Sequence, residues 1–289
     1  MLCVIFCFTL AILVKSHVNQ HCEVRTVLAA ERKQQIKEII IAKKSASVAA
    51  LAKQFGVTGE TIRRDLKALE KEGVLIRTHG GAFIQSGVEN LIDMDLRKTV
   101  YLDEKELIAK RCCRLVHNGD AIFLDNSSTC YHIAKALCDL NITVVTNNLM
   151  IINLFAQTEN VRLVSIGGEF SIKEQAFSGA IAQRALSDYY VDKAFISCRT
   201  LSIDNGITES TDQWASIRHL MIERSDKQYL VVDHTKFGQT SFVRICDFGE
   251  ITAVVTDSEL DAKWHEALHS KGCDIIDRDL KHEDTELLG

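Results

Sequence analysis

Apolar residues recur at the spacing of one helical face between residues 30 and 44. Ile36, Ile39 and Ile40 form a stripe in a segment that otherwise carries mainly glutamate, arginine, lysine and glutamine. Side chains three and four positions apart lie on the same side of an α-helix. The pattern therefore predicts an amphipathic helix over this segment.

A second helix is predicted directly after Ser47. The hydroxyl of Ser47 can accept a hydrogen bond from an exposed backbone N–H at the start of a helix. Val48, Leu51 and Phe55 keep the helical spacing, and Gly56 is the residue type that most often follows a helix end. The sequence thus predicts a short helix that begins after Ser47 and ends at Gly56.

A third helix is expected to begin at Thr58, which can cap it. Glu60 lies in its first turn, where the helix dipole favours a negative charge. Ile62, Leu66 and Leu69 share one face. The opposite face carries the basic side chains of Arg63, Arg64, Lys67 and Lys71.

The segment 75–82 alternates briefly and contains paired glycines, Gly80 and Gly81, which is typical of a short hairpin. The predicted order is then helix, helix, turn, basic helix and hairpin. This is the winged form of the helix-turn-helix, in which the third helix enters the major groove of duplex DNA.

Charge is divided unevenly along the chain. Residues 27–86 carry 11 lysines and arginines against 6 acidic residues, whereas residues 87–289 carry 21 against 32. Only the first part is suited to a polyanion, although a basic helix face by itself is usually just solvated. The residues predicted to contact double-stranded DNA are Ser47, Thr58, Glu60, Thr61, Arg63, Arg64, Lys67, Arg77 and His79.

Short apolar runs alternate with helical patterns in the remainder of the chain. The runs that predict strands are 121–124, 142–145, 161–166, 194–197, 229–232 and 253–255. Amphipathic stretches such as 104–116, 131–138 and 213–224 lie between them. Strands interleaved with helices predict a doubly wound, largely parallel α/β sheet covered on both faces.

Small polar residues follow several of these strands. Ligands of such sheets bind beyond the carboxyl ends of the strands, and hydroxyls with backbone N–H groups at a helix start can hold an anion. Taken singly, each is an ordinary cap, turn or surface lysine, but their convergence at one edge favours a site. Lys236 is expected to supply the one positive charge of this site. The residues at this edge that could contact such a ligand are Asp125, Asn126, Ser127, Ser128, Thr129, Asn147, Gly167, Gly168 and Lys236.

Specific strings in the chain resemble the DeoR family of bacterial transcription regulators. Residues 47–66 read SVAALAKQFGVTGETIRRDL, and HGGA follows at 79–82. The resemblance extends to about residue 257. It implies a recognition helix containing Thr61, Arg63 and Arg64, and a sensor domain similar in fold to ribose-5-phosphate isomerase. It also implies that the polar residues named above, from Asp125 to Thr129, Asn147, Gly167, Gly168 and Lys236, are the effector contacts. The family often has Gly-Thr-Thr where this chain has Ser127-Ser128-Thr129.

The resemblance also implies a function. The chain is expected to be a DNA-binding regulator, usually a repressor of a carbohydrate-metabolism operon, whose operator affinity is changed by a phosphorylated sugar or related metabolite. Modules of this type commonly bind paired half-sites as dimers, so we expect a homo-oligomer. The alternative is a sugar-phosphate-processing enzyme with an appended DNA-binding module, for which Asp125, Asp233 and Glu209 are the nearest carboxylates.

A length of 289 residues favours two domains. We expect a winged helix-turn-helix at 27–85, a linker at 86–102, a sensor domain at 103–278 and a polar tail at 279–289. The apolar start of the leader, 1–26, is too short to span a bilayer; a start codon set too far upstream is favoured over a genuine anchor.

No disulfide, metal, cofactor or catalytic chemistry is expected. The chain has ten cysteines, no CxxC pair and the adjacent pair Cys112-Cys113, which indicates reduced thiols in the cytoplasm. With 46% apolar and 25% charged residues the composition is that of a soluble globular protein, so no membrane association is expected. Cys130 near a predicted helix start is either oxidisable or, more commonly, a buried inert thiol. The histidines His132, His219 and His234 are scattered, so neither a metal nor another cofactor is predicted, and no catalytic residue is assigned.

Overall fold

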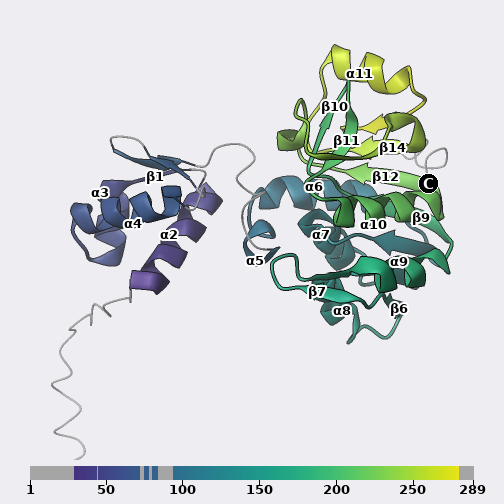
Figure 1. The fold of residues 1–289 in the computed structure, drawn as a ribbon, viewed down its shortest axis with the longest axis horizontal. Coiled ribbons are helices and arrows are strands. Elements are labelled where there is room, and N and C mark those ends of the chain that lie inside the picture. The colour runs from purple at the N-terminus through teal and green to yellow at the C-terminus, as the bar shows by residue number, and fades with distance from the viewer. Residues whose placement is uncertain (1–28, 44, 72–74, 78–79, 84–93, 280–289) are drawn as a thin grey trace, which may run out of the picture.

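A computed structural model of the chain describes residues 29–43, 45–71, 75–77, 80–83 and 94–279. The predicted leader 1–26, most of the predicted linker, His79 and residues 280–289 lie outside the described residues. Figure 1 shows two units, an N-terminal one built on helices and a C-terminal one built on a sheet.

The N-terminal unit is a winged helix-turn-helix, as the sequence predicts. Its described elements are α2 (Ala29–Lys43), β1 (Ser45–Ser47), α3 (Val48–Phe55), α4 (Gly59–Lys71), β2 (Ile76–Arg77) and β3 (Gly81–Phe83). Ser47 caps α3 by accepting from the N–H of Ala50 at 3.1 Å, and Gly56 adopts the left-handed conformation with φ 62°. Thr58 accepts from the N–H of Thr61 at 3.2 Å.

The core of this unit is formed where the three helices meet. Ile36 of α2, Leu51 of α3 and Ile62 of α4 are at most 1% exposed. A buried ion pair joins α2 to α4, with 2.8 Å between Arg32 Nε and Asp65 Oδ2. The sequence reasoning did not predict β1, which pairs antiparallel with β3 and gives the small sheet the order β1-β3-β2.

The C-terminal unit centres on a seven-stranded parallel sheet. The elements before the switch in strand order are α5 (Met94–Arg97), α6 (Leu102–Cys113), β4 (Ala121–Leu124), α7 (Ser128–Ala136), β5 (Ile142–Thr146), α8 (Leu149–Phe155), β6 (Val161–Ser165), β7 (Glu169–Ser171), β8 (Ala176–Ser178) and α9 (Gly179–Ser187). Those after it are β9 (Val191–Ile196), β10 (Thr200–Ser202), β11 (Gly206–Glu209), α10 (Asp212–Glu223), β12 (Ser225–Val231), the 3-10 turns η2 (His234–Lys236) and η3 (Phe248–Glu250), β13 (Val243–Cys246), β14 (Ala253–Val255), α11 (Ala262–His269) and β15 (Asp274–Ile276).

The order of the sheet is β15-β14-β12-β9-β4-β5-β6, with every neighbouring pair parallel. From β4 the chain moves outward through β5 to β6, then returns and adds β9 on the other side of β4. The strand order therefore reverses between β4 and β9, and such a switch point is where doubly wound sheets bind ligands.

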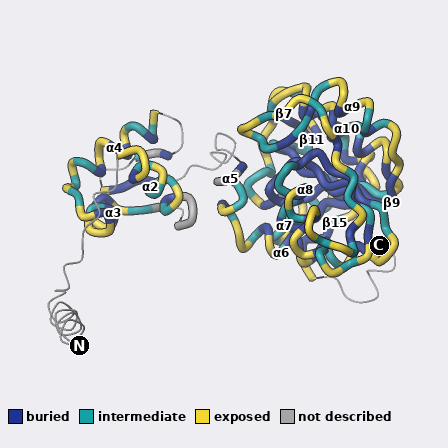
Figure 2. The backbone as a smooth tube through the Cα atoms, turned by 90° about the horizontal axis from the view of Figure 1, so that it is seen from below, coloured by how far each residue is buried: buried dark blue, intermediate teal, exposed yellow. Residues whose placement is uncertain are grey.

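Both faces of the sheet are covered, which confirms the predicted fold class. On β4, Phe123 packs into the core shared with α9 and α10, whereas Ile122 and Leu124 pack into the core shared with α6, α7 and α8. Successive side chains of a strand point to opposite faces, so one strand serves both cores. Figure 2 shows buried segments of the chain running through the interior of this unit, with more exposed segments around them.

Several smaller elements were not predicted. The strands β10, β11 and β13 form an antiparallel sheet, and β7 pairs with β8 as a hairpin. The helix α5 lies inside the range predicted as linker, where the N–H of Met94 donates to the carbonyl of Lys173 at 3.1 Å. Among the described residues, no helix combines the length and apolar character needed to cross a bilayer.

Candidate functional site

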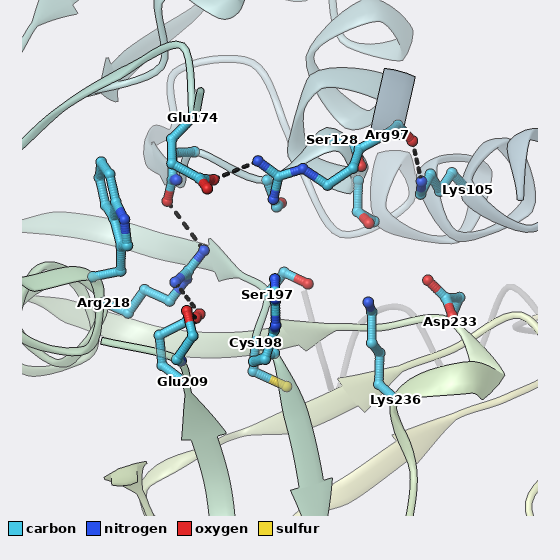
Figure 3. A pocket seen from close by; sticks show the side chains of 16 residues that line it. Arg97, Lys105, Ser128, Glu174, Ser197, Cys198, Glu209, Arg218, Asp233 and Lys236 are labelled. Carbon is cyan, nitrogen blue, oxygen red and sulfur yellow. Dashed lines mark hydrogen bonds and ion pairs between the residues drawn. The ribbon is translucent and has the colours of Figure 1, made fainter. Parts of the chain in front are cut away.

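A polar pocket lies at the switch point of the sheet. Its walls come from the segments that follow β4 and β9, from α5, α6 and α10, and from the turns after β7 and β12. The lining residues are Arg97, Lys105, Asn126, Ser127, Ser128, Thr129, Glu174, Ser197, Cys198, Arg199, Glu209, Ser210, Trp214, Arg218, Asp233 and Lys236. Figure 3 shows Arg97 and Lys105 on one side, facing Cys198 and Lys236 across the pocket.

The N-terminus of α7 opens into this pocket. Ser127 caps the helix by accepting from the N–H of Cys130 at 3.1 Å. Its own N–H donates to Asp125 Oδ1 at 2.8 Å. Within the described residues, the backbone N–H groups of Ser128 and Thr129 have no recorded acceptor. Such N–H groups at a helix start attract an anion, and the helix dipole adds to the attraction.

Arg218 of α10 forms the floor of the pocket. Its Nε donates to Asp125 Oδ2 at 2.8 Å, and Nη2 donates to Asn126 Oδ1 at 3.0 Å. Nη1 donates to Glu209. The guanidinium is 7% exposed and holds the loop after β4, the end of β11 and α10 in one network.

The charges of this network stabilise one another. Burial acts to raise the pKa of Asp125, but Arg218 and hydrogen bonds from Ser127 and Ser197 lower it overall. Burial acts to lower the pKa of Arg218, but Glu209 and Asp125 raise it above its ordinary value. Both groups are therefore charged in the folded protein.

A second charged group lies on the opposite wall. Asp233 is 2% exposed and accepts from the N–H of Thr235 at 3.0 Å. Burial acts to raise the pKa of Asp233, but the positive charges of Lys236 and Lys105 lower it overall. Asp233 thereby orients the turn that carries Lys236.

The net charge of the lining is positive. Five of the lining side chains are basic and three are acidic, although the C-terminal part of the chain is acidic overall. An anionic ligand is therefore favoured over a cationic one. Arg97 also pairs with Glu174, while its Nε is buried without a recorded protein acceptor.

The outer face of α4 presents basic side chains to solvent. Arg63, Arg64 and Lys67 are exposed, whereas Ile62 and Leu66 on the opposite face are buried. Arg63 Nη1 donates to Glu60 Oε2 at 3.2 Å, so the two form an exposed pair. The exposed face of α4 is therefore predominantly basic.

Comparison with protein-family models identifies both units. Residues 32–87 match the DeoR-like helix-turn-helix domain, and residues 101–258 match the DeoR C terminal sensor domain. The chain belongs to the DeoR family. It is accordingly a transcriptional regulator, and the C-terminal unit that holds the pocket is its sensor domain.

Individual relatives of this DeoR-family regulator carry similar names. The chain is 39% identical to the uncharacterized HTH-type transcriptional regulator YulB of Bacillus subtilis, over 85% of this chain and 95% of the relative. It is 34% identical to the L-fucose operon activator of Haemophilus influenzae, over 74% and 86%. It is 29% identical to the lactose phosphotransferase system repressor of Staphylococcus epidermidis, over 79% and 92%.

A partial likeness to a solved structure accompanies these matches. Ribose 5-phosphate isomerase A from Methanocaldococcus jannaschii overlaps 47% of this chain and 54% of its own, with 19% identity and a TM-score of 0.36.

The pocket of the DeoR-family sensor domain contains part of the predicted effector set. Asn126, Ser127, Ser128, Thr129 and Lys236 line it. The expectation that Lys236 is the one positive charge at this edge is wrong, because three arginines and a second lysine also line the pocket.

The other predicted effector contacts lie outside the lining and support its frame. Asp125 is fully buried beneath it, and Asn147 Nδ2 donates to the carbonyl of Phe177 at 2.7 Å. A Cβ on Gly168 would lie 2.4 Å from the carbonyl of Ser178, so this glycine permits close packing against β8; Gly167 lies next to it.

Some of the predicted DNA contacts lie on α4, whereas others act as helix caps or form an ion pair. Thr61, Arg63, Arg64 and Lys67 lie on α4, with Glu60 in its first turn. Ser47 and Thr58 are occupied as helix caps, and Arg77 Nε pairs with Glu70 Oε2 at 2.6 Å beside the wing. His79 lies outside the described residues.

The residues that the sequence analysis missed come from distant parts of the chain. Arg218 could have been predicted from the sequence, because it lies between Ala215 and Met221 on the buried face of α10. A basic residue in an apolar stripe is a signal of a buried ion pair. Arg97 gave no such signal, since it lies in the segment predicted as linker.

The remaining candidates have structural explanations. Cys130 is fully buried, and burial raises the pKa of its thiol well above the ordinary value. His132 Nε2 lies 2.9 Å from the carbonyl of Lys98, and His234 Nδ1 lies 2.8 Å from Asp257 Oδ2. Within the described residues, no group of three or more His, Cys, Asp or Glu side chains is arranged to hold a metal ion.

Proposed function

We propose that this DeoR-family regulator binds operator DNA through α4 and the wing, and that a phosphorylated sugar or closely related metabolite in the sensor pocket changes its DNA affinity. The observation that carries the effector proposal is the open N-terminus of α7 facing the basic side chains of Lys105 and Lys236. Helix N-termini with nearby cations are the usual protein binding sites for phosphate.

The remainder of the pocket suits the sugar part of such a ligand. Asn126, Ser197 and Ser210 provide polar groups beside the anion site, and Trp214 provides an apolar surface. Hydroxyl-rich ligands are recognised by convergent donors and acceptors of this kind. The names of the fucose-operon and lactose-system relatives support a carbohydrate operon as the regulated target.

Contacts to DNA are assigned to the N-terminal unit, in which Thr61, Arg63, Arg64 and Lys67 present the outer face of α4. The acidic sensor domain is unsuited to a phosphate backbone. We further propose that the regulator acts in the cytoplasm, as a repressor and as a homo-oligomer on paired half-sites. Symmetric operators demand paired recognition helices, which supports this assembly.

We do not assign a catalytic function. A general base that works near neutral pH needs a pKa close to the working pH, whereas the pKa values of Asp125 and Asp233 are lowered. Incubation of the protein with sugar phosphates should return them unchanged. Detection of an isomerised or dephosphorylated product at an enzymatic rate would replace this proposal with the alternative of an enzyme.

The effector proposal is tested by thermal unfolding in the presence of hexose and pentose phosphates, each paired with its unphosphorylated sugar. A phosphorylated ligand at a hundredfold excess over its Kd stabilises the folded state by about 2.7 kcal/mol. Lys236→Ala should lose most of the shift, whereas Lys263→Ala on the exposed side of α11 should retain it. Equal shifts from a sugar and its phosphate would refute a phosphate site.

A further inference from the structure

The turn between α5 and α6 contacts both units of the regulator. Arg97 at the end of α5 lines the sensor pocket. Three residues later, Val100 is 3% exposed and packs in the apolar cluster of the winged-helix core, against which Tyr101 also packs. A displacement of this turn would therefore be felt at the base of the DNA-binding unit.

Lys105 connects this turn to the pocket. The side chain is 4% exposed, and Nζ donates to the carbonyls of Arg97 and Val100, both at 2.6 Å. The same ammonium lines the pocket beside Asp233. One cation is thus shared between backbone acceptors of the turn and the ligand site (Figure 3).

Other contacts hold the turn on the sensor side. The carbonyl of Lys98 lies 2.9 Å from His132 Nε2, and the ring of Tyr101 meets that of His234 edge-on at 5.7 Å. Tyr101 itself has φ 51°, in the left-handed region that residues with a Cβ rarely adopt. Such a conformation persists only while its surroundings hold it, and it is common in switch regions.

We propose that Lys105 couples the sensor pocket to the winged helix: an anion bound in the pocket draws its ammonium from the carbonyls of Arg97 and Val100, and the turn then shifts against the winged-helix core. This inference rests on the proposed function, because it requires an effector that carries a phosphate or a similar anion.

The balance of hydrogen bonds supports this exchange. A lysine ammonium bonds a phosphate oxygen more strongly than a neutral carbonyl, because both partners are then charged. The bound anion would also attract Arg97, because its buried Nε has no protein acceptor among the described residues. The strain at Tyr101 lowers the cost of releasing the turn. Couplings between two sites commonly change affinity by about 5- to 150-fold.

Amide hydrogen exchange on the full-length protein, with inorganic phosphate as the probe, tests both the binding and the coupling. The unbonded N–H groups of Ser128 and Thr129 report binding. The N–H of Lys105, which donates to the carbonyl of Tyr101 at 3.1 Å, reports the turn. Phosphate should slow exchange over 126–130 and accelerate it over 98–105.

Variants test the coupling, and Val100→Ala separates it from binding because Val100 does not line the pocket. In Lys105→Met, exchange over 98–105 should be fast without phosphate and should not respond to it. Phosphate should then change the Kd for a DNA fragment selected by the wild type less than twofold. Lys110→Met is the matched control on the exposed side of α6, and it should behave as wild type. Val100→Ala should keep both exchange responses and lose only the response of the DNA Kd.

The outcomes distinguish the two proposals. Slower exchange over 126–130 with unchanged exchange over 98–105 in the wild type would overturn the coupling role of Lys105 and leave the phosphate site intact. Absence of any effect over 126–130 would overturn the phosphate site, and the coupling would fall with it. A DNA Kd that still responds fully in Lys105→Met would also overturn the coupling.

Discussion

Arg218 donates from Nε to Asp125 Oδ2 at 2.8 Å, across 93 positions of sequence. Asp125 in turn accepts from the N–H groups of Ser127 and Ser197, which follow the two strands that flank the switch point. The pair therefore fixes two loops that line the polar pocket. Its role is structural, because it holds the residues that line the pocket in place.

Removal of Arg218 should destabilise the sensor domain strongly. In Arg218→Ala, two buried carboxylates lose their common partner, and breaking a buried ion pair from one side costs about 3–5 kcal/mol. Urea unfolding should show this loss, while Arg162→Ala, at an exposed position of β6, should stay within about 0.5 kcal/mol of wild type. A loss below about 1 kcal/mol would show that the network is not structural.

Stability should depend on pH at the acid end through Asp125. The folded protein lowers the pKa of this carboxyl below its ordinary value. Its contribution is therefore complete above the unfolded pKa of about 4 and is lost as pH falls through the folded pKa. The free energy of unfolding, measured in urea between pH 7 and pH 3, should fall less steeply in Asp125→Asn. Identical acid slopes would contradict this assignment.

The paired glycines of the wing should respond differently to substitution. A Cβ on Gly81 would lie 2.2 Å from the carbonyl oxygen of Ala46, whereas nothing lies within 4 Å of a Cβ on Gly80. Gly81→Ala should disturb the β1–β3 pairing and cost about 1–3 kcal/mol. Gly80→Ala should be nearly neutral. Amide exchange in α3 and α4 measures the loss of stability in each variant. Equal losses in Gly81→Ala and Gly80→Ala would argue against the wing geometry.

Arg64 should contribute to DNA binding through charge. Arg64→Ala should weaken binding and reduce the slope of log Kd against log salt by about 1, because one phosphate contact is lost. Fluorescence anisotropy with a selected duplex measures this slope. Lys263→Ala, which removes an exposed charge from the sensor domain, is the control. An unchanged slope in Arg64→Ala would place the contact elsewhere on the protein.

Much of the fold was predictable, because its main elements follow local patterns. The helix after Ser47 and the strand at 121–124 both show their period in a few residues. The strand β1 has only the residues Ser45–Ser47 and no alternation, so its identity depends on pairing with β3. The order of the seven strands is likewise a long-range property that no single segment encodes.

The site was predictable only in part, for the same reason. Ser127 and Thr129 were found because hydroxyls after a strand mark a helix start at the binding edge. Glu174 and Arg97 were missed, since their pairing joins residues 77 positions apart. Asn147 and Gly168 were expected to contact the effector; in the structure Asn147 bonds the carbonyl of Phe177, and Gly168 packs against Ser178.

The central claim is that a phosphorylated ligand in the sensor pocket changes the affinity of α4 for DNA. It is tested most directly by fluorescence anisotropy with a selected duplex, with and without the sugar phosphate that gives the largest thermal shift. The account predicts a change of about 5- to 150-fold in Kd for the wild type, and unaltered DNA binding with no such response for Lys236→Ala. An equal response in Lys236→Ala, or none in the wild type with the ligand bound, would contradict it.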